Sequence, residues 1–179
     1  MWTNGVDREI TNLKSAAAGF TDQPFVYSVV TNGGEFPSCK GVVGYFRTPN
    51  AGGAGEWFID FNDNGVIGAG EGPFVWGQKG DIAVPNANSF SSSRLMVFRS
   101  STGEWIRDTN GNRVWDGCGV DSCTTFGAPN DVPFANPNGR LIGTSRGTSR
   151  FVDANGNFSW DVGDATYTFG NAGAQAVLL

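Results

Sequence analysis

Three segments of this 179-residue chain repeat the same order of features, and an internal repeat restricts the fold more strongly than any other property of the sequence. Each segment starts with a short apolar stretch that ends in arginine and then passes through a turn rich in Gly, Ser and Thr. A second apolar stretch follows, runs into an acidic loop, and is closed by an aromatic residue next to glycine. The arginine-ending stretches are residues 44–47, 96–99 and 143–146, and the aromatic–glycine pairs are residues 76–77, 126–127 and 169–170.

The length of the repeat predicts its architecture. The first aspartates of the three acidic loops, Asp60, Asp108 and Asp153, are 48 and 45 residues apart. A period in the forties with two to four strands per unit is typical of propeller blades and related β-repeats. We therefore expect an all-β fold of three antiparallel blade-like repeats, arranged like a propeller or closed as a barrel by strands from neighbouring subunits.

The repeat boundaries follow from the same pattern. Residues at both ends of the chain are out of phase with the repeats, and an unpaired strand exposes N–H and C=O groups that invite pairing with another chain. Residues 1–20 and 174–179 are therefore predicted to be exchanged between copies of the chain, and the competing arrangement is that the two ends pair with each other within one chain. The expected parts are an extension at residues 1–20, repeats at residues 21–77, 78–127 and 128–170, and the strand of a partial fourth repeat at residues 171–179.

Composition favours strands and argues against two classes of partner. The chain holds 27 glycines and 13% aromatic residues but only 16% charged residues, which favours short strands joined by tight turns. Its formal net charge of −5 argues against a nucleic-acid partner, because such proteins need a basic face. No apolar stretch approaches the roughly 18 residues of a membrane helix, so we do not expect membrane insertion.

The three acidic loops have a spacing that suits calcium. Calcium takes roughly six to eight oxygens, and a tight loop can present the side chains at its positions 1, 3 and 5 toward one centre. The first loop matches the pattern D-x-[DN]-x-[DN]-G-x5-E over its full length. The predicted ligands are Asp60, Asn62, Asn64 and Glu71 in the first loop, Asp108, Asn110, Asn112 and Asp116 in the second, and Asp153, Asn155, Asn157, Asp161 and Asp164 in the third.

Several features of these loops predict weak binding or a different role. Asparagine in place of aspartate lowers the charge of each site, which predicts dissociation constants of roughly 10⁻⁴–10⁻³ M. At position 6, where glycine usually makes the sharp turn, the second loop has Arg113 and the third has Phe158. At position 12 the second loop has Gly119, with only Asp121 as a substitute acid. The alternative is that the loops are tight turns, since Asn and Gly tolerate a left-handed backbone.

The three cysteines predict one local crosslink. Cys118 and Cys123 lie close together in one loop, and this spacing favours a disulfide between them. A zinc half-site is the rival interpretation, but the chain has no histidine and no second close cysteine pair to complete it. We expect Cys39 to be a free thiol that packs as a small apolar residue.

The loops and junctions together resemble a known group of repeats. The D-x-N-x-N-x-x-x-D loops, the Phe-Gly junctions and the Phe-Gly-Ala-Pro stretch at residues 126–129 are similar to FG-GAP or VCBS-type repeats of secreted bacterial proteins. Residues 105–116 match the W-x-x-D-x-N-G-N-x-x-W-D core of such repeats. The resemblance covers residues 20–177. It implies a propeller-like arrangement, calcium held at residues 108–116 and 153–161, and a location outside the cytoplasm.

The residue types argue against an enzyme. Without histidine the chain has no Ser-His-Asp, Cys-His or His-metal centre. A glycosidase with paired carboxylates is formally open, but the clustered acids follow the repeat, whereas catalytic residues would break it. We therefore predict a non-enzymatic protein, and the resemblance to secreted repeats implies that it is extracellular or attached to the cell surface.

Two non-enzymatic functions fit these observations. The first is a structural subunit that assembles with itself, by strand exchange, into a fibre or surface layer. The second is a monomeric, calcium-dependent module for glycan binding or adhesion, in which Trp57, Trp105 or Trp115 would be exposed stacking platforms. The competing role for these tryptophans is core packing. Of the two functions, the sequence favours the structural subunit.

Overall fold

The computed structural model describes residues 19–31, 38–84, 94–136 and 141–174, and for residues 26–31 and 38–40 it describes the backbone only. All of the regular elements in these ranges are strands, and none is a helix. The strands are β1 (Phe20–Thr31), β2 (Ser38–Pro49), β3 (Ala54–Ile59), β4 (Phe74–Gln78), β5 (Asp81–Ala83), β6 (Met96–Arg99), β7 (Glu104–Arg107), β8 (Ser122–Thr125), β9 (Val132–Ala135), β10 (Ile142–Arg146), β11 (Ser149–Val152) and β12 (Ala165–Thr168).

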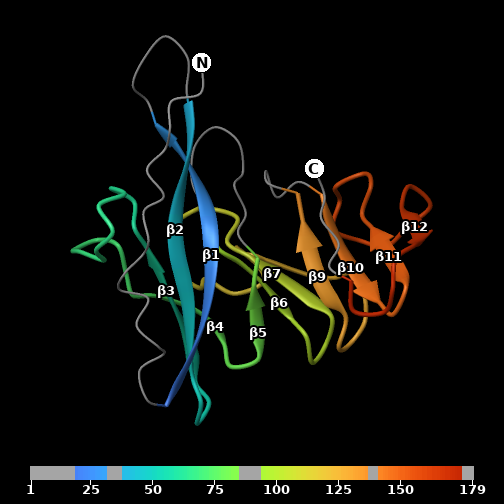
Figure 1. Cartoon of the computed structure of the whole chain (residues 1–179), viewed down its shortest axis with the longest axis horizontal. Coiled ribbons are helices and arrows are strands. Elements are labelled where there is room, and N and C mark those ends of the chain that lie inside the picture. Colours follow the sequence, from blue (N-terminus) through green and yellow to red (C-terminus); the bar gives the residue numbers. More distant parts are fainter. Residues whose placement is uncertain (1–18, 32–37, 85–93, 137–140, 175–179) are drawn as a thin grey trace.

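The strands form three antiparallel sheets of four strands each, and consecutive strands pair within every sheet. The first sheet contains β1–β4, the second β5–β8 and the third β9–β12, and the three follow one another across the molecule (Figure 1). The predicted all-β fold of three antiparallel blade-like repeats is therefore confirmed. Within the described residues the sheets are open, as in propeller blades, and a barrel completed by strands of neighbouring subunits stays a prediction.

The sheets can be placed on the sequence repeats. Each sheet falls almost entirely within one of the ranges expected for the repeats, residues 21–77, 78–127 and 128–170. The segments predicted to be exchanged, residues 1–20 and 174–179, lie outside the described residues except for 19, 20 and 174. Exchange of these strands therefore stays a prediction.

Two buried cores join the three sheets. The first lies between the first and second sheets, and the second lies between the second and third. The second sheet contributes one face to each core, because alternate residues of a strand point to opposite faces. The first core contains Phe25, Val42, Phe46, Trp57, Ile59, Trp76, Leu95, Val97 and Ile106, and the second contains Val84, Met96, Phe98, Trp105, Phe126, Ile142 and Phe158.

A phenylalanine–tryptophan pair is repeated at the same register in the first two sheets. Phe46 lies opposite Trp57 across β2 and β3, and Phe98 lies opposite Trp105 across β6 and β7. Each indole Nε1–H donates a hydrogen bond to the carbonyl of the aromatic residue that closes the same repeat, at 3.0 and 2.8 Å. The buried polar atom of each tryptophan is thereby satisfied, as burial requires.

An aspartate–arginine pair joins the first and second strands of every sheet. Each arginine donates both Nε and Nη2 to one carboxylate, and two of the three aspartates are 1% exposed. The partners are 25, 18 and 15 residues apart, so the local sequence gives no direct sign of the contact. The pairs are Arg47–Asp22 (2.8 and 3.0 Å), Arg99–Asp81 (3.0 and 3.1 Å) and Arg146–Asp131 (2.7 and 3.0 Å).

Close packing requires glycine in two of the second strands. A Cβ on Gly44 would lie 2.7 Å from the ring of Phe25, and a Cβ on Gly143 would lie 2.3 Å from the ring of Phe134. Both distances are far below van der Waals contact, so the phenylalanine ring occupies the space that the glycine leaves. The second sheet has no glycine at this position of its second strand. Met96 is there instead, and its carbonyl accepts a hydrogen bond from the N–H of the smaller Val84.

Candidate functional site

The acidic loops occupy equivalent places in the three sheets. Each connects the third strand of its sheet to the fourth, between β3 and β4, β7 and β8, and β11 and β12. Each begins with an aspartate whose side chain points inward: Asp60 is 8% exposed, and Asp108 and Asp153 are fully buried. A buried carboxylate needs hydrogen-bond donors, and the loops themselves supply them.

Each buried aspartate accepts hydrogen bonds from backbone N–H groups of its own loop. Successive N–H groups that converge in this way form a nest for an anion. Burial raises the pKa of Asp153, and its bonds from the loop amides lower that pKa to a smaller extent. The donors are Asn64 (3.1 Å) and Gly65 (2.7 Å) to Asp60, Gly111 (2.6 Å) and Arg113 (3.1 Å) to Asp108, and Gly156 (2.8 Å), Asn157 (3.2 Å) and Phe158 (2.7 Å) to Asp153.

A second carboxylate closes each loop from its far end. The closing acids are Glu71, Asp121 and Asp164, and each accepts two backbone N–H bonds. Asp121 has the same place as the other two, although it lies two residues beyond position 12 of its loop. The donors are Asn62 (3.1 Å) and Gly68 (2.7 Å) in the first loop, Thr109 (3.2 Å) and Asp116 (2.9 Å) in the second, and Ala154 (3.1 Å) and Asp161 (2.7 Å) in the third.

The asparagines at positions 3 and 5 fix the turns. The Oδ1 atoms of Asn62, Asn64, Asn110, Asn112, Asn155 and Asn157 each accept the N–H two residues later, at 2.8 to 3.0 Å. In the second and third loops both asparagines also donate to the acid at position 9, Asp116 or Asp161. These bonds from Asn110 and Asn112 lower the pKa of Asp116. The pKa of Asp161 is lowered most by the N–H of Gly163, and then by its two asparagines.

The three loops differ in how well they fit calcium. In the first loop the oxygens of Asp60, Asn62, Asn64 and Glu71 keep lone pairs beyond their N–H bonds, as calcium requires. In the other two loops the position-9 carboxylate faces two amide NH2 groups, and both would have to turn before oxygens faced a cation. Of the three loops, the first therefore fits calcium best. Its ligand set mixes two acids with two amides, and within the described ranges no group of three or more Asp, Glu, Cys or His residues could hold a metal.

Position 6 has a left-handed backbone in all three loops, although only the first has glycine there. The φ angles are 61° at Arg113 and 63° at Phe158. Both side chains contact the preceding sheet or its loop. The guanidinium of Arg113 lies 4.6 Å from the ring of Phe61, and Phe158 is buried in the second core under the guanidinium of Arg107, 3.9 Å away. The departure from glycine at this position thus serves a contact between repeats.

Position 8 is a tryptophan in the second and third loops, and both side chains reach back in the same direction. The ring of Trp115 lies 5.8 Å from that of Trp76, and the ring of Trp160 lies 5.8 Å from that of Phe126. Their targets are the aromatic residues that close the preceding repeat. We call the residues at positions 6 and 8 of these two loops, Arg113, Trp115, Phe158 and Trp160, the clasp residues.

Two of the three tryptophans considered as stacking platforms are part of the core. Trp57 and Trp105 have no exposed surface, so both have the core-packing role that the sequence favoured, and neither can stack on a glycan. Trp115 is 45% exposed. The sequence alone cannot separate these cases, because strand register buries the first two while a loop carries the third.

The cysteines of the second loop are bonded to each other. The sulfur atoms of Cys118 and Cys123 form a disulfide with a Cα–Cα distance of 5.3 Å. The bridge spans Asp121, the acid that closes the loop, and so restrains the segment that carries it. Cys39 lies in β2 where only the backbone is described, so its predicted role falls outside the described side chains.

Comparison with known proteins gives no match: no family model, no curated protein and no solved structure is similar to the chain. The resemblance to FG-GAP or VCBS-type repeats is therefore still a prediction. Among the described elements, no helix is long and apolar enough to cross a membrane.

Proposed function

We propose that this chain is a non-enzymatic structural protein of the cell exterior that assembles with copies of itself, sheet against sheet. One observation carries the proposal. Trp76, Phe126 and Phe169 are the equivalent aromatic residues that close the three repeats; the first two are 1% and 0% exposed, and the third is 58% exposed. The first two are covered by the sheet that follows each of them, whereas in the described part of the chain no sheet follows the third.

The outward face of the third sheet carries exposed aromatic residues but differs from the two covered faces. Tyr167, beside Phe169, is 51% exposed, and their rings lie 6.4 Å apart. The register places Ser145 and Arg150 where the other sheets have phenylalanine and tryptophan. Arg150 is buried and donates to the carbonyls of residues 147, 149 and 174. This mixture of aromatic and polar groups suits an interface between subunits better than a domain core.

The outward face of the first sheet is a suitable partner. Tyr45 and Phe58 stack there with centroids 4.7 Å apart, and Arg47 lies over both rings. At the equivalent positions of the second sheet, Val97 and Ile106 are buried against the first sheet. Docking of the first sheet of one copy on the third sheet of another would therefore repeat a contact that the chain already makes twice. Such a head-to-tail contact is heterologous and produces a ring or an open fibre.

The acids and the disulfide agree with this assignment. The loop carboxylates of Asp60, Asp108 and Asp153 each accept hydrogen bonds from backbone N–H groups, which is a structural use of an acid. A disulfide is typical of an oxidising compartment such as the cell exterior.

We expect the purified chain to self-associate in a concentration-dependent manner, and we expect Tyr167→Ser combined with Phe169→Ser to weaken this at least about 10-fold. Both side chains are more than half exposed, so their loss should leave the fold intact. Sedimentation velocity over a concentration series measures the effect.

The matched control is Val114→Ser combined with Val120→Ser. These two valines are 55% and 56% exposed, but they belong to the second loop rather than to an outward sheet face. The control should associate like the wild type. A wild-type chain that stays monomeric at every concentration, or a control that loses association equally, would contradict the proposal.

We further propose that calcium binds weakly in the first loop, at Asp60, Asn62, Asn64 and Glu71. At millimolar calcium and a dissociation constant near 10⁻⁴ M, one site should raise the free energy of unfolding by about 1.5 kcal/mol. Urea unfolding with calcium and with a chelator measures this increment.

Asp60→Asn should remove the calcium increment, because it removes a charge while keeping one acceptor for the loop amides. Asp161→Asn in the third loop is the comparison variant and should keep the increment, since two asparagines already donate to that carboxylate. If the wild type had the same free energy of unfolding with calcium and with chelator, the proposed calcium site would be wrong.

A further inference from the structure

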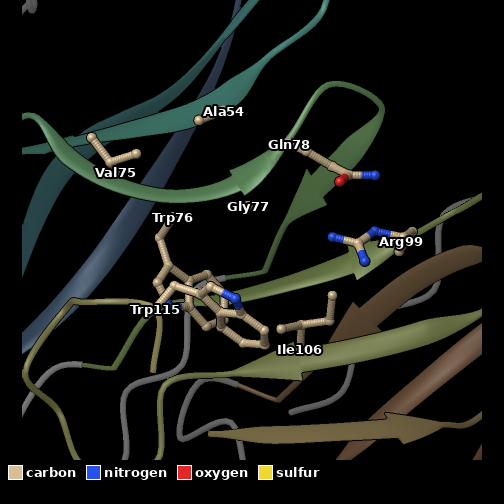
Figure 2. A pocket seen from close by; sticks show the side chains of 8 residues that line it. All are labelled: Ala54, Val75, Trp76, Gly77, Gln78, Arg99, Ile106 and Trp115. Carbon is tan, nitrogen blue, oxygen red and sulfur yellow. The ribbon is translucent and has the colours of Figure 1, made fainter. Parts of the chain in front are cut away.

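A groove of about 310 Å³ lies between the first and second sheets. The indoles of Trp76 and Trp115 form one end of it, and Ile106 forms an apolar wall. The amide of Gln78 and the guanidinium of Arg99 lie at the other end (Figure 2). The groove thus has an aromatic surface and two hydrogen-bonding groups within reach of one ligand. It is separate from the calcium ligands of the first loop and from the outward face of the third sheet.

The aromatic end of the groove is held in place before any ligand arrives. The ring of Trp115 meets that of Trp76 edge to face, with 79° between their planes, and 45% of Trp115 is open to solvent. The loop that carries Trp115 is restrained by two buried acids, Asp108 and Asp121, and by the disulfide. An exposed indole fixed in this way loses little conformational freedom on binding.

The polar end is also fixed, and it carries no net positive charge. Arg99 donates two hydrogen bonds to the buried carboxylate of Asp81, which holds the guanidinium in one orientation, and the carboxylate of Glu104 lies 3.9 Å from its Nη1. Gln78 is exposed, and its side-chain amide can both donate and accept. A ligand there meets donors and an acceptor without net electrostatic attraction for an anion.

We propose that this groove binds a neutral oligosaccharide, with one sugar ring stacked on Trp115 and its hydroxyls bonded to Gln78 and Arg99. A pyranose ring has an apolar C–H face and a rim of hydroxyl groups that both donate and accept, and the groove offers the complement of each. The neutralised charge of Arg99 disfavours phosphate or uronate ligands. A peptide would need an exposed strand edge or a deep side-chain pocket, and the groove is bounded by side chains instead.

The test uses the full chain and a panel of neutral oligosaccharides, namely cellohexaose, chitohexaose, xylohexaose and mannohexaose, with oligogalacturonate as the anionic comparison. Isothermal titration calorimetry and tryptophan fluorescence report binding. At least one neutral member should bind saturably and change the fluorescence, and the anionic comparison should not bind. Trp115→Ala should weaken that binding at least about 10-fold.

Trp160→Ala is the matched control, because Trp160 has the same loop position and a similar exposure, 50%, but lies at the junction of the second and third sheets. It should bind like the wild type. Gln78→Ala removes an exposed side chain and should weaken binding without affecting the melting temperature. No binding by any neutral member, preferential binding of oligogalacturonate, or equal loss in Trp115→Ala and Trp160→Ala would overturn the proposal.

Discussion

Phe158→Gly is expected to lower the free energy of unfolding by about 3 kcal/mol, although the backbone at this position has the left-handed conformation that glycine prefers. Phe158 is 4% exposed, packs in the second core and lies under Arg107. Loss of a buried phenylalanine costs about 3–5 kcal/mol. Relief of the left-handed strain returns only about 1–2 kcal/mol. Urea unfolding followed by fluorescence measures the difference.

Asn130→Gly is the control, because Asn130 is exposed and also has a positive φ of 66°. Asparagine tolerates this conformation, so the change should stay within about 0.5 kcal/mol. Arg113→Gly should fall between the two, since its side chain stacks on Phe61 but stays partly exposed. If Phe158→Gly were as stable as the wild type, the side chain at position 6 would not stabilise the contact between repeats, and Phe158 would not be a clasp residue.

Asp81→Ala is expected to destabilise the chain by about 3 kcal/mol. Asp81 is 1% exposed and accepts two bonds from Arg99 and a third from the N–H of Gln78. Its removal leaves a partly buried guanidinium, 23% exposed, whose remaining carboxylate partner is the more exposed Glu104, 3.9 Å from its Nη1. Removal of one partner of a buried ion pair costs more than the pair itself contributes, because the remaining charge is uncompensated. Thermal unfolding and urea unfolding should both show the loss.

Asp131→Ala provides the comparison, since the same pair occurs in the third sheet with a more exposed arginine. Arg146 is 55% exposed, so water can solvate it after its partner is removed. We expect a cost about half that of Asp81→Ala. Equal costs at both sites would show that exposure of the arginine does not govern the pair.

The repeats and the all-β fold were predictable because the signals for them are local. Strand composition, aromatic–glycine junctions and the D-x-N-x-N loops each occupy a few consecutive residues, and they recur at nearly constant spacing. The aspartate–arginine pairs were missed because their partners are 15 to 25 residues apart. An aspartate within three residues of where each first strand begins was the signal that could have revealed them.

The loops show a different limit. Compared with the loop motif, Arg113 and Phe158 are departures from a glycine position. The motif describes a single loop and carries no information on contacts with other repeats. In the structure both residues keep the left-handed backbone and use their side chains on another repeat. Likewise Trp105 and Trp115 are the same residue type ten positions apart, but the register of β7 buries Trp105, whereas Trp115 lies in a loop and is exposed.

The direction of the clasp residues has a consequence for how the protein is made and pulled apart. Each of the clasp residues contacts the repeat that precedes its own, so the contact between two repeats forms only when the second repeat has left the ribosome. During synthesis each completed sheet would therefore expose an aromatic face until the loop that covers it has been translated. Under mechanical tension the order reverses: a pull at the C-terminal end removes the third loop first, and each loss uncovers the sheet behind it. A load along the chain would then be resisted one repeat at a time, as in stacked repeat proteins.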